Sequence, residues 1–234
     1  IMAIIAIIIL IEAGRRVLGL ALSLIAVIFL AYDFLGPYMP ELIIHKGASL
    51  NKIAGHMFLT TEGIFGVPLG VSAGFVFLFV LFGSLLDKAG AGEYFINLAF
   101  SMLGKYRGGS AKASIIASGF MGIMSGSSIA NTVTTGTFTI PLMKRTGFRA
   151  EQAAAVEVSA SSNGQLMPPV MGAAAFIMAE FLGMAYTDVV IAAFIPAFVA
   201  YFGLFYIIHL EALKLGLKGM DDEDIPPKWK TFIQ

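Results

Sequence analysis

The sequence has no cysteine, few charges and few histidines, and each shortage excludes a class of function. Without cysteine there is no disulfide, no thiolate zinc site and no cysteine nucleophile. Only 13% of residues are charged, and lysine plus arginine balances aspartate plus glutamate, so the charge indicates no nucleic-acid partner. The histidines are His45, His56 and His209, and His209 lies far along the chain from the other two, which supports neither a zinc site nor a catalytic dyad.

What the sequence has in excess is apolar surface, since 58% of its residues are hydrophobic. Each membrane crossing needs about 20 mostly apolar residues. Stretches 17–36, 64–86 and 187–210 meet that length, and residues 1–11 read as the end of a further crossing. We therefore predict an all-α polytopic membrane protein, with lipid as its main surroundings. Because the chain begins inside an apolar run without a methionine start, we expect a piece of a longer protein.

An interrupted apolar stretch lies between two basic clusters, one at residues 105–112 and one at residues 144–149. Cytoplasmic loops are enriched in lysine and arginine, so two basic ends indicate that the stretch enters and leaves on one face. The interruption reads SGSSIANT, and we predict a re-entrant helical hairpin that turns there. This topology puts every lysine and arginine except Lys46 and Lys52 on one side. The alternative is a plain crossing helix with a patch of small residues for packing.

The next stretch, 150–182, contains a second interruption, SASSNGQLMPP. It predicts a membrane helix broken into two halves, which Pro168 and Pro169 keep from closing because neither has an amide hydrogen. Unpaired backbone groups are tolerated in a membrane only where protein, water or ligand satisfies them. Many secondary transporters bind their ions at broken helices near mid-membrane, through half-helix ends and neutral oxygens. Close helix packing by small residues is the alternative reading of either break.

Among the acidic residues of this stretch, Glu157 falls within a half-helix. Intramembrane carboxylates are usually functional, which favours a coupling or substrate-gating role. A side chain that reaches toward the membrane interface is the equally open alternative. An enzyme is not expected, because the serines of the two breaks have no histidine or lysine beside them to act as a base.

Four ordered segments of the sequence read TTEGIFGVPLGVSAGFVFLFVLFGSLL, LGKYRGGSAKASIIASG, SGSSIANTVTTGTFTIPLMKRTGF and SSNGQLMPPVMGAAAFIMAEFLG. Together they resemble the large permease subunit of tripartite ATP-independent periplasmic (TRAP) transporters. Residues 1–47, with IEAGRRVLG, resemble the end of the small-subunit-like region that the TAXI subgroup fuses to its permease. The resemblance covers about Thr60 to Lys218. It implies an elevator-type ion-transporter fold, of which this chain is the first of two inverted repeats.

The resemblance also implies a site, made where the hairpin tip meets the broken helix. The sodium ligands that it implies are Ser125, Gly126, Ser128, Asn131, Ser162, Asn163 and Gly164. The substrate contacts that it implies are Ser127, Ser128, Thr132, Asn163, Gln165 and Pro168. Asn163 departs from the family pattern, in which threonine or glycine is expected at this position. The resemblance implies sodium as the coupling ion, and no cofactor is expected.

The expected function is a sodium-coupled permease that imports organic acids across a bacterial or archaeal inner membrane with a periplasmic substrate-binding protein. The other expected partners are the remaining half of the permease, its small-subunit-like helices and lipid. A standalone dicarboxylate symporter and a non-transporting structural subunit are the alternatives. The expected regions are 1–47 (small-subunit-like end), 48–109 (scaffold helices and an interfacial arm at 91–103), 110–182 (hairpin and broken helix), 183–218 (a membrane helix) and 219–234 (a polar cytoplasmic loop).

Overall fold

The computed structural model describes residues 1–227 and 231, and within them every regular element is helical. The chain divides into two compact units, Ile1–Gly70 and Val71–Gln234. Three helical stretches in the described residues are long and apolar enough to cross a membrane: Leu20–Tyr38, Val67–Lys88 and Tyr186–Lys214. They coincide with the three predicted spans. An all-helical, multi-pass membrane protein is therefore confirmed at this coarse level.

The first unit is built around a pair of helices, α1 (Met2–Leu18) and α2 (Leu20–Leu35), followed by α3 (Leu50–Leu59). Gly19 alone separates α1 from α2, and its positive φ of 91° permits the abrupt reversal that a side chain would hinder. The hydroxyl of Ser23 lies 3.3 Å from the carbonyl oxygen of Ile11, which holds the two helices together.

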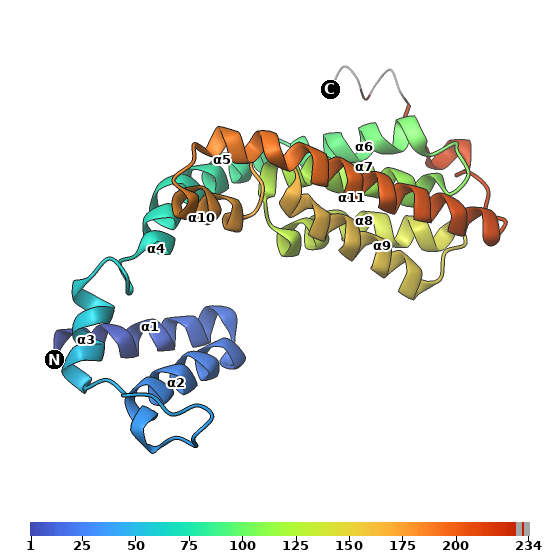
Figure 1. The fold of residues 1–234 in the computed structure, drawn as a ribbon. Helices are drawn as coiled ribbons and strands as arrows, with labels where there is room; N and C mark the ends of the chain where they lie inside the picture. Colours follow the sequence, from blue (N-terminus) through green and yellow to red (C-terminus); the bar gives the residue numbers. More distant parts are fainter. Residues whose placement is uncertain (228–230, 232–234) are drawn as a thin grey trace. The chain divides into compact units, whose positions relative to one another are not determined.

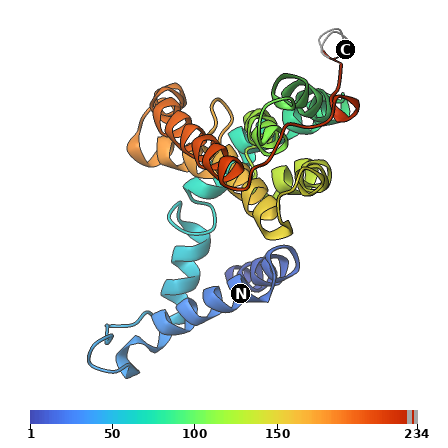
Figure 2. The same cartoon turned by 90° about the vertical axis from the view of Figure 1, so that its right-hand side faces the viewer.

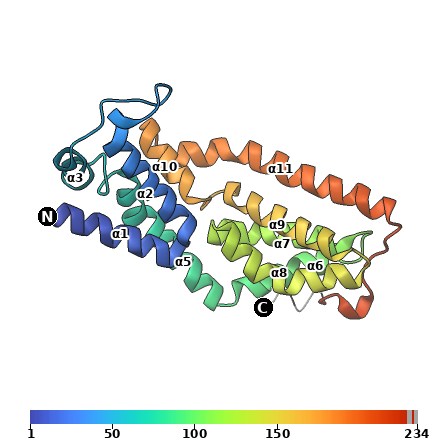
Figure 3. The ribbon, with the colours of Figure 1, turned by 90° about the horizontal axis from the view of Figure 1, so that it is seen from below.

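The second unit contains the predicted hairpin and broken helix. Its helices are, in chain order, α5 (Phe77–Lys88), α6 (Ala91–Leu103), α7 (Gly109–Ser125), α8 (Ser128–Arg145), α9 (Ala150–Asn163), α10 (Ala173–Leu182) and α11 (Tyr186–Lys214). A short helix, α4 (Val67–Val71), and a π-helical turn, Ser72–Val76, lead into α5 without a gap. Helices α6, α7, α8 and α9 run alongside one another, and α11 passes along the same bundle (Figures 1 and 3). Figure 2 views this bundle nearly end-on.

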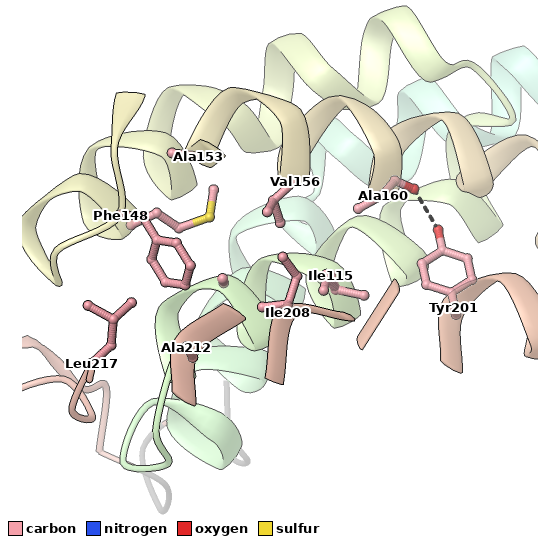
Figure 4. Packing of buried hydrophobic residues seen from close by; sticks show 11 residues of the cluster. Ile115, Phe148, Ala153, Val156, Ala160, Tyr201, Ile208, Ala212 and Leu217 are labelled. Atoms are coloured by element: carbon pink, nitrogen blue, oxygen red, sulfur yellow. Dashed lines mark hydrogen bonds between the residues drawn. The ribbon is translucent and has the colours of Figure 1, made fainter. Parts of the chain in front are cut away.

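The largest buried cluster of this unit lies between α7, α9 and α11. Ile115 is fully buried at its centre and packs among Val156 and Ile208 (Figure 4). Tyr201 closes one end of the cluster, where its hydroxyl donates a hydrogen bond of 2.9 Å to the carbonyl of Ala160. This packing fixes the broken helix against α7 and α11, so the two predicted breaks are held by a common core.

Two segments that the sequence predicted to lie at the surface are partly buried within the protein. The predicted interfacial arm is α6, and it packs against α7 through buried residues that include Ile96, Ala99 and Phe100. The predicted polar loop also returns to this helix, because Met220 is buried and its amide donates to the carbonyl of Gly104. Part of that loop, residues 228–230 and 232–234, lies outside the described residues. The position of α6 at a membrane surface stays a prediction.

Candidate functional site

The hairpin of α7 and α8 is a true reversal of the chain. Gly126 takes a left-handed conformation with φ of 56°, and Ser127 is extended, so the helix cannot continue through them. At the other end of the hairpin, the hydroxyls of Ser110 and Thr146 lie 2.6 Å apart. The two basic ends of this segment are therefore neighbours, and the alternative of a single straight helix is wrong for this structure. That the hairpin is re-entrant in a membrane remains a prediction.

The first break is shorter than the sequence predicted. Only Gly126 and Ser127 are non-helical, whereas Ser128, Asn131 and Thr132 already belong to α8. The reason is local capping: the hydroxyl of Ser127 accepts a hydrogen bond from the amide of Ala130 at 3.3 Å. A capped helix can begin at once, since one of its unpaired amides is already satisfied.

The second break begins later than predicted. Ser162 and Asn163 still lie in the last turn of α9, and the irregular segment runs from Gly164 to Gly172. A helix can accommodate serine and asparagine, but a regular helix cannot continue through the two prolines at 168 and 169. The break is closed by a hydrogen bond of 2.8 Å from the amide of Gly172 to the carbonyl of Gln165.

The two breaks meet in the structure. The side-chain amide of Gln165 donates a hydrogen bond of 2.8 Å to the hydroxyl of Ser128. The backbones approach so closely that a Cβ on Gly122 would lie 2.6 Å from the Cα of Gly164. A Cβ on Gly164 itself would lie 2.9 Å from Nδ2 of Asn131, so this buried side chain rests against the second break. Glycine is required at these contacts because any side chain would separate the helices.

Not every predicted site residue reaches this meeting point through its side chain. The hydroxyl of Thr132 donates to the carbonyl of Ser128 within its own helix, and that of Ser125 accepts from the amide of Ser127. Ser162 is exposed on α9. Pro168 is buried, and its peptide bond to Pro169 is cis. Ion and substrate binding by any of these residues stays a prediction.

Two cavities flank the hairpin tip. One, of about 650 Å³, lies beside α10 and α11, and its polar lining comes from both breaks, at Ser127 and Gln165. The other, of about 360 Å³, lies on the α5 side and is lined by Ser125, Ser127 and Asp87 among others. Ser127 lines both cavities, so the predicted substrate contacts at Ser127 and Gln165 border open space.

Glu157 is fully buried, which excludes the alternative that it reaches toward an interface. Its carboxyl lies between α8 and α9 and accepts hydrogen bonds from Thr135, from Thr139 at 2.5 Å and from Ser161 at 3.2 Å. Buried carboxyl groups need such partners, because an unpaired polar group in the interior is costly. Within the described residues, no basic side chain forms an ion pair with it.

The sequence interpretation missed the hydroxyls that surround Glu157. A signal was present, because Asn131, Thr135 and Thr139 recur at intervals of four and so share one face of α8. The same interval relates Ser114 to Ser118 on α7, and Glu157 to Ser161 on α9. Polar side chains repeated at this interval in an apolar hairpin indicate a buried polar interface between helices.

Comparison with known proteins assigns the family. The profile of the family described as "Tripartite ATP-independent periplasmic transporter, DctM component" matches residues 5–234. The C4-dicarboxylate TRAP transporter large permease protein DctM of Vibrio cholerae is 32% identical over 131 residues, which are 55% of this chain and 27% of that protein. The DctM protein of Rhodobacter capsulatus is 35% identical over 91 residues, 39% of this chain and 21% of that protein.

The isethionate TRAP transporter permease protein DctMQ of Oleidesulfovibrio alaskensis is 34% identical over 91 residues, 39% of this chain and 14% of that protein. The chain thus matches about a quarter or less of the length of these relatives. The profile match extends over nearly the whole chain and includes the hairpin, the broken helix and the contacts between them. This chain therefore belongs to the family of large permease components, of the DctM type, of tripartite ATP-independent periplasmic transporters.

Proposed function

We propose that the complete protein is the permease of a sodium-coupled, binding-protein-dependent transporter that imports organic acids across the inner membrane of a bacterium or archaeon. In this proposal the chain contributes the first hairpin and the first broken helix of an elevator-type fold with two inverted repeats. The relatives named for C4-dicarboxylates and for isethionate favour an organic anion as the substrate. Sodium is the coupling ion, and no ATP is used.

The observation that carries the proposal is the contact between the two breaks, at Gln165 with Ser128 and at Asn131 with Gly164. Hydroxyl, amide and carbonyl oxygens are suitable ligands for a hard cation, by extension from other hard metal ions. Helices α7 and α9 end at the breaks and direct carbonyls there, whereas α8 and α10 begin there and direct amide groups. Carbonyl ends favour a cation, and amide ends favour an organic anion.

Uptake by the full-length permease in proteoliposomes, with its periplasmic binding protein, tests this function. The proposal predicts that uptake of a C4-dicarboxylate or a related organic acid requires both the binding protein and an inward sodium gradient. Uptake that is unchanged when the sodium gradient is removed would reject the coupling. Uptake without the binding protein would favour a standalone symporter, and absence of uptake for all acids tried, with a folded protein, would favour a structural subunit.

A further inference from the structure

The smaller of the two cavities at the hairpin tip, of about 360 Å³, has oxygen-bearing side chains and no basic side chain in its described lining. The residues with side-chain oxygens are Ser84, Asp87, Ser125, Ser127 and Thr134. Asp87, on α5, is the one charged residue of that lining. Hydroxyl and carboxylate oxygens are suitable partners for a hard cation, so the chemistry of this cavity favours a cation over an anion.

The end of α7 adds main-chain oxygen to the same cavity. Gly83 of α5 packs so closely against α7 that a Cβ there would lie 2.6 Å from the carbonyl oxygen of Met124. Met124 lies in the last turn of α7, where carbonyls lack a helical amide partner and the helix dipole is negative. Gly83 and Met124 both line the cavity. Its lining is therefore electronegative on the α5 side and on the α7 side.

The cavity extends along the hairpin from its tip toward its base. Ser125 and Ser127 line it at the tip. Met121, one turn earlier on α7, and Thr134, in the second turn of α8, line it nearer the base. Since a helical turn rises about 5.4 Å, the cavity follows the hairpin for roughly 5–10 Å.

The carboxyl of Asp87 lies at the level of Met121. A Cβ on Gly92 would lie 3.1 Å from Oδ1 of Asp87 and 3.4 Å from Sδ of Met121. Asp87 is exposed and is followed by Lys88, the last residue of α5. The cavity therefore connects the first break with an exposed carboxyl at the end of α5. Because Gly92 is in the first turn of α6, the same carboxyl also has a structural alternative, which is to stabilise the start of that helix.

The larger cavity, beside α10 and α11, differs in its chemistry. Its described lining has no charged side chain, and it includes Gly172 and Ala173, where α10 begins. The amide groups at the start of a helix favour an anion. Ser127 lines both cavities, so a cation and an organic anion have separate routes to the first break.

We propose that the α5-side cavity is a passage for sodium between the breaks and the side of the membrane at which α5 ends, and that the negative charge of Asp87 draws the ion into it. This inference rests on the proposed function, in which sodium binds where the two breaks meet. Asp87 acts at a distance and is not a ligand at the breaks. A unit charge about 10 Å from a cation changes its affinity roughly twofold to fifteenfold, depending on the water between them.

Thiol labelling measures the charge preference of the cavity without relying on sodium coupling. Thr134→Cys and Thr137→Cys, in a full-length permease without other cysteines, are a matched pair, because both lie on α8 and Thr134 alone of the two lines the cavity. Each variant is treated in detergent with a cationic and an anionic thiol reagent of similar size. We expect the ratio of cationic to anionic rate to be about fivefold higher at Thr134→Cys, since a negative potential attracts cations. Equal ratios at the two positions would overturn the passage.

Sodium affinity tests the role of Asp87. The unfolding midpoint of the purified full-length permease is measured against sodium concentration, with choline keeping the ionic strength constant. We expect Asp87→Asn to raise the half-saturating sodium concentration about threefold to tenfold, and Asp87→Glu, which restores the charge, to stay within about twofold of the wild type. Glu93→Gln is the control, because Glu93 is an exposed carboxyl in the first turn of α6 that does not line the cavity.

Failure of this inference is distinguishable from failure of the proposed function. An Asp87→Asn variant that unfolds at a lower temperature but needs no more sodium than the wild type would leave Asp87 only its contact with α6, and would overturn the inference. An equal rise in half-saturating sodium for Glu93→Gln would do the same. If Asp87→Asn does not fold, the two α8 cysteine variants decide, because they retain Asp87. Sodium-independent uptake by the wild type would instead overturn the proposed function, and this inference with it.

Discussion

The contact of the hairpin tip with the second break predicts that Gly126 cannot be replaced even by alanine. A Cβ on Gly126 would lie 2.0 Å from the carbonyl oxygen of Met171, which is main chain and cannot rotate away. The left-handed conformation of Gly126, with φ of 56°, adds a second cost. A residue other than glycine in this conformation costs roughly 1–2 kcal/mol, and forcing an extra atom into a packed contact costs about 1–3 kcal/mol.

Gly183 provides a matched control for this variant. It also follows the last residue of a helix, with a similar φ of 62°, but a Cβ there would meet no atom within 4 Å. Gly183→Ala therefore incurs the conformational cost alone, roughly 1–2 kcal/mol, whereas Gly126→Ala incurs both, roughly 2–5 kcal/mol. The difference between the two variants isolates the contact with Met171.

The assay is thermal unfolding of the purified full-length permease in detergent, followed by sodium-driven uptake. We expect Gly126→Ala to lower the unfolding midpoint at least twice as far as Gly183→Ala, and to abolish uptake that Gly183→Ala retains. The ratio of the two midpoint shifts matters more than either shift alone, since membrane proteins often unfold irreversibly. Equal midpoint shifts with equal uptake would show that the close approach of the two breaks contributes nothing to stability or transport.

Two further predictions concern the core that holds the site. Ile115→Ala is expected to destabilise the permease by roughly 2 kcal/mol or more through the cavity that it leaves. Its control is Ile191→Ala, which should change the unfolding midpoint little because the Ile191 side chain is 68% exposed. Similar midpoints for the two variants would contradict the observed core. Tyr201→Phe is expected to lower the free energy of unfolding by about 1 kcal/mol through loss of the hydrogen bond to Ala160. Its control is Tyr206→Phe, at a half-exposed side chain. An unchanged unfolding midpoint for Tyr201→Phe would show that this hydrogen bond contributes nothing.

The helical architecture could be predicted because it depends on patterns that are local in the sequence. Apolar stretches long enough to cross a membrane predicted the spans, and the helix-breaking Gly126 and the prolines at 168 and 169 predicted the two interruptions. The limits of the interruptions were less well predicted. Ser128 and Asn163 were expected in irregular segments, but serine and asparagine are compatible with helix ends, and capping by Ser127 lets α8 begin early.

The hydroxyls that surround Glu157 could not be placed from local patterns alone. Ser118 and Ser161, whose hydroxyls lie 3.1 Å apart, are 43 residues apart in the sequence, and only the packing of α7 against α8 and α9 brings these polar side chains together. The repeat of polar residues at intervals of four indicated a polar helix face, but it could not show which face of which helix opposes it. The close approaches of Gly122 to Gly164 and of Gly126 to Met171 were hidden for the same reason, since a glycine in a sequence does not reveal its neighbour.

In the proposed topology, α7 and α8 fold back and leave the membrane on the side where they entered. Arg107 precedes the hairpin and Lys144 lies at its end, and both are exposed. Single-cysteine variants at these positions, in a full-length permease without other cysteines, can be treated with a membrane-impermeant thiol reagent in sealed vesicles of known orientation. We predict that Arg107→Cys and Lys144→Cys are labelled from the same side and Lys46→Cys from the other. Labelling of Arg107→Cys and Lys144→Cys from opposite sides would rule out the re-entrant hairpin.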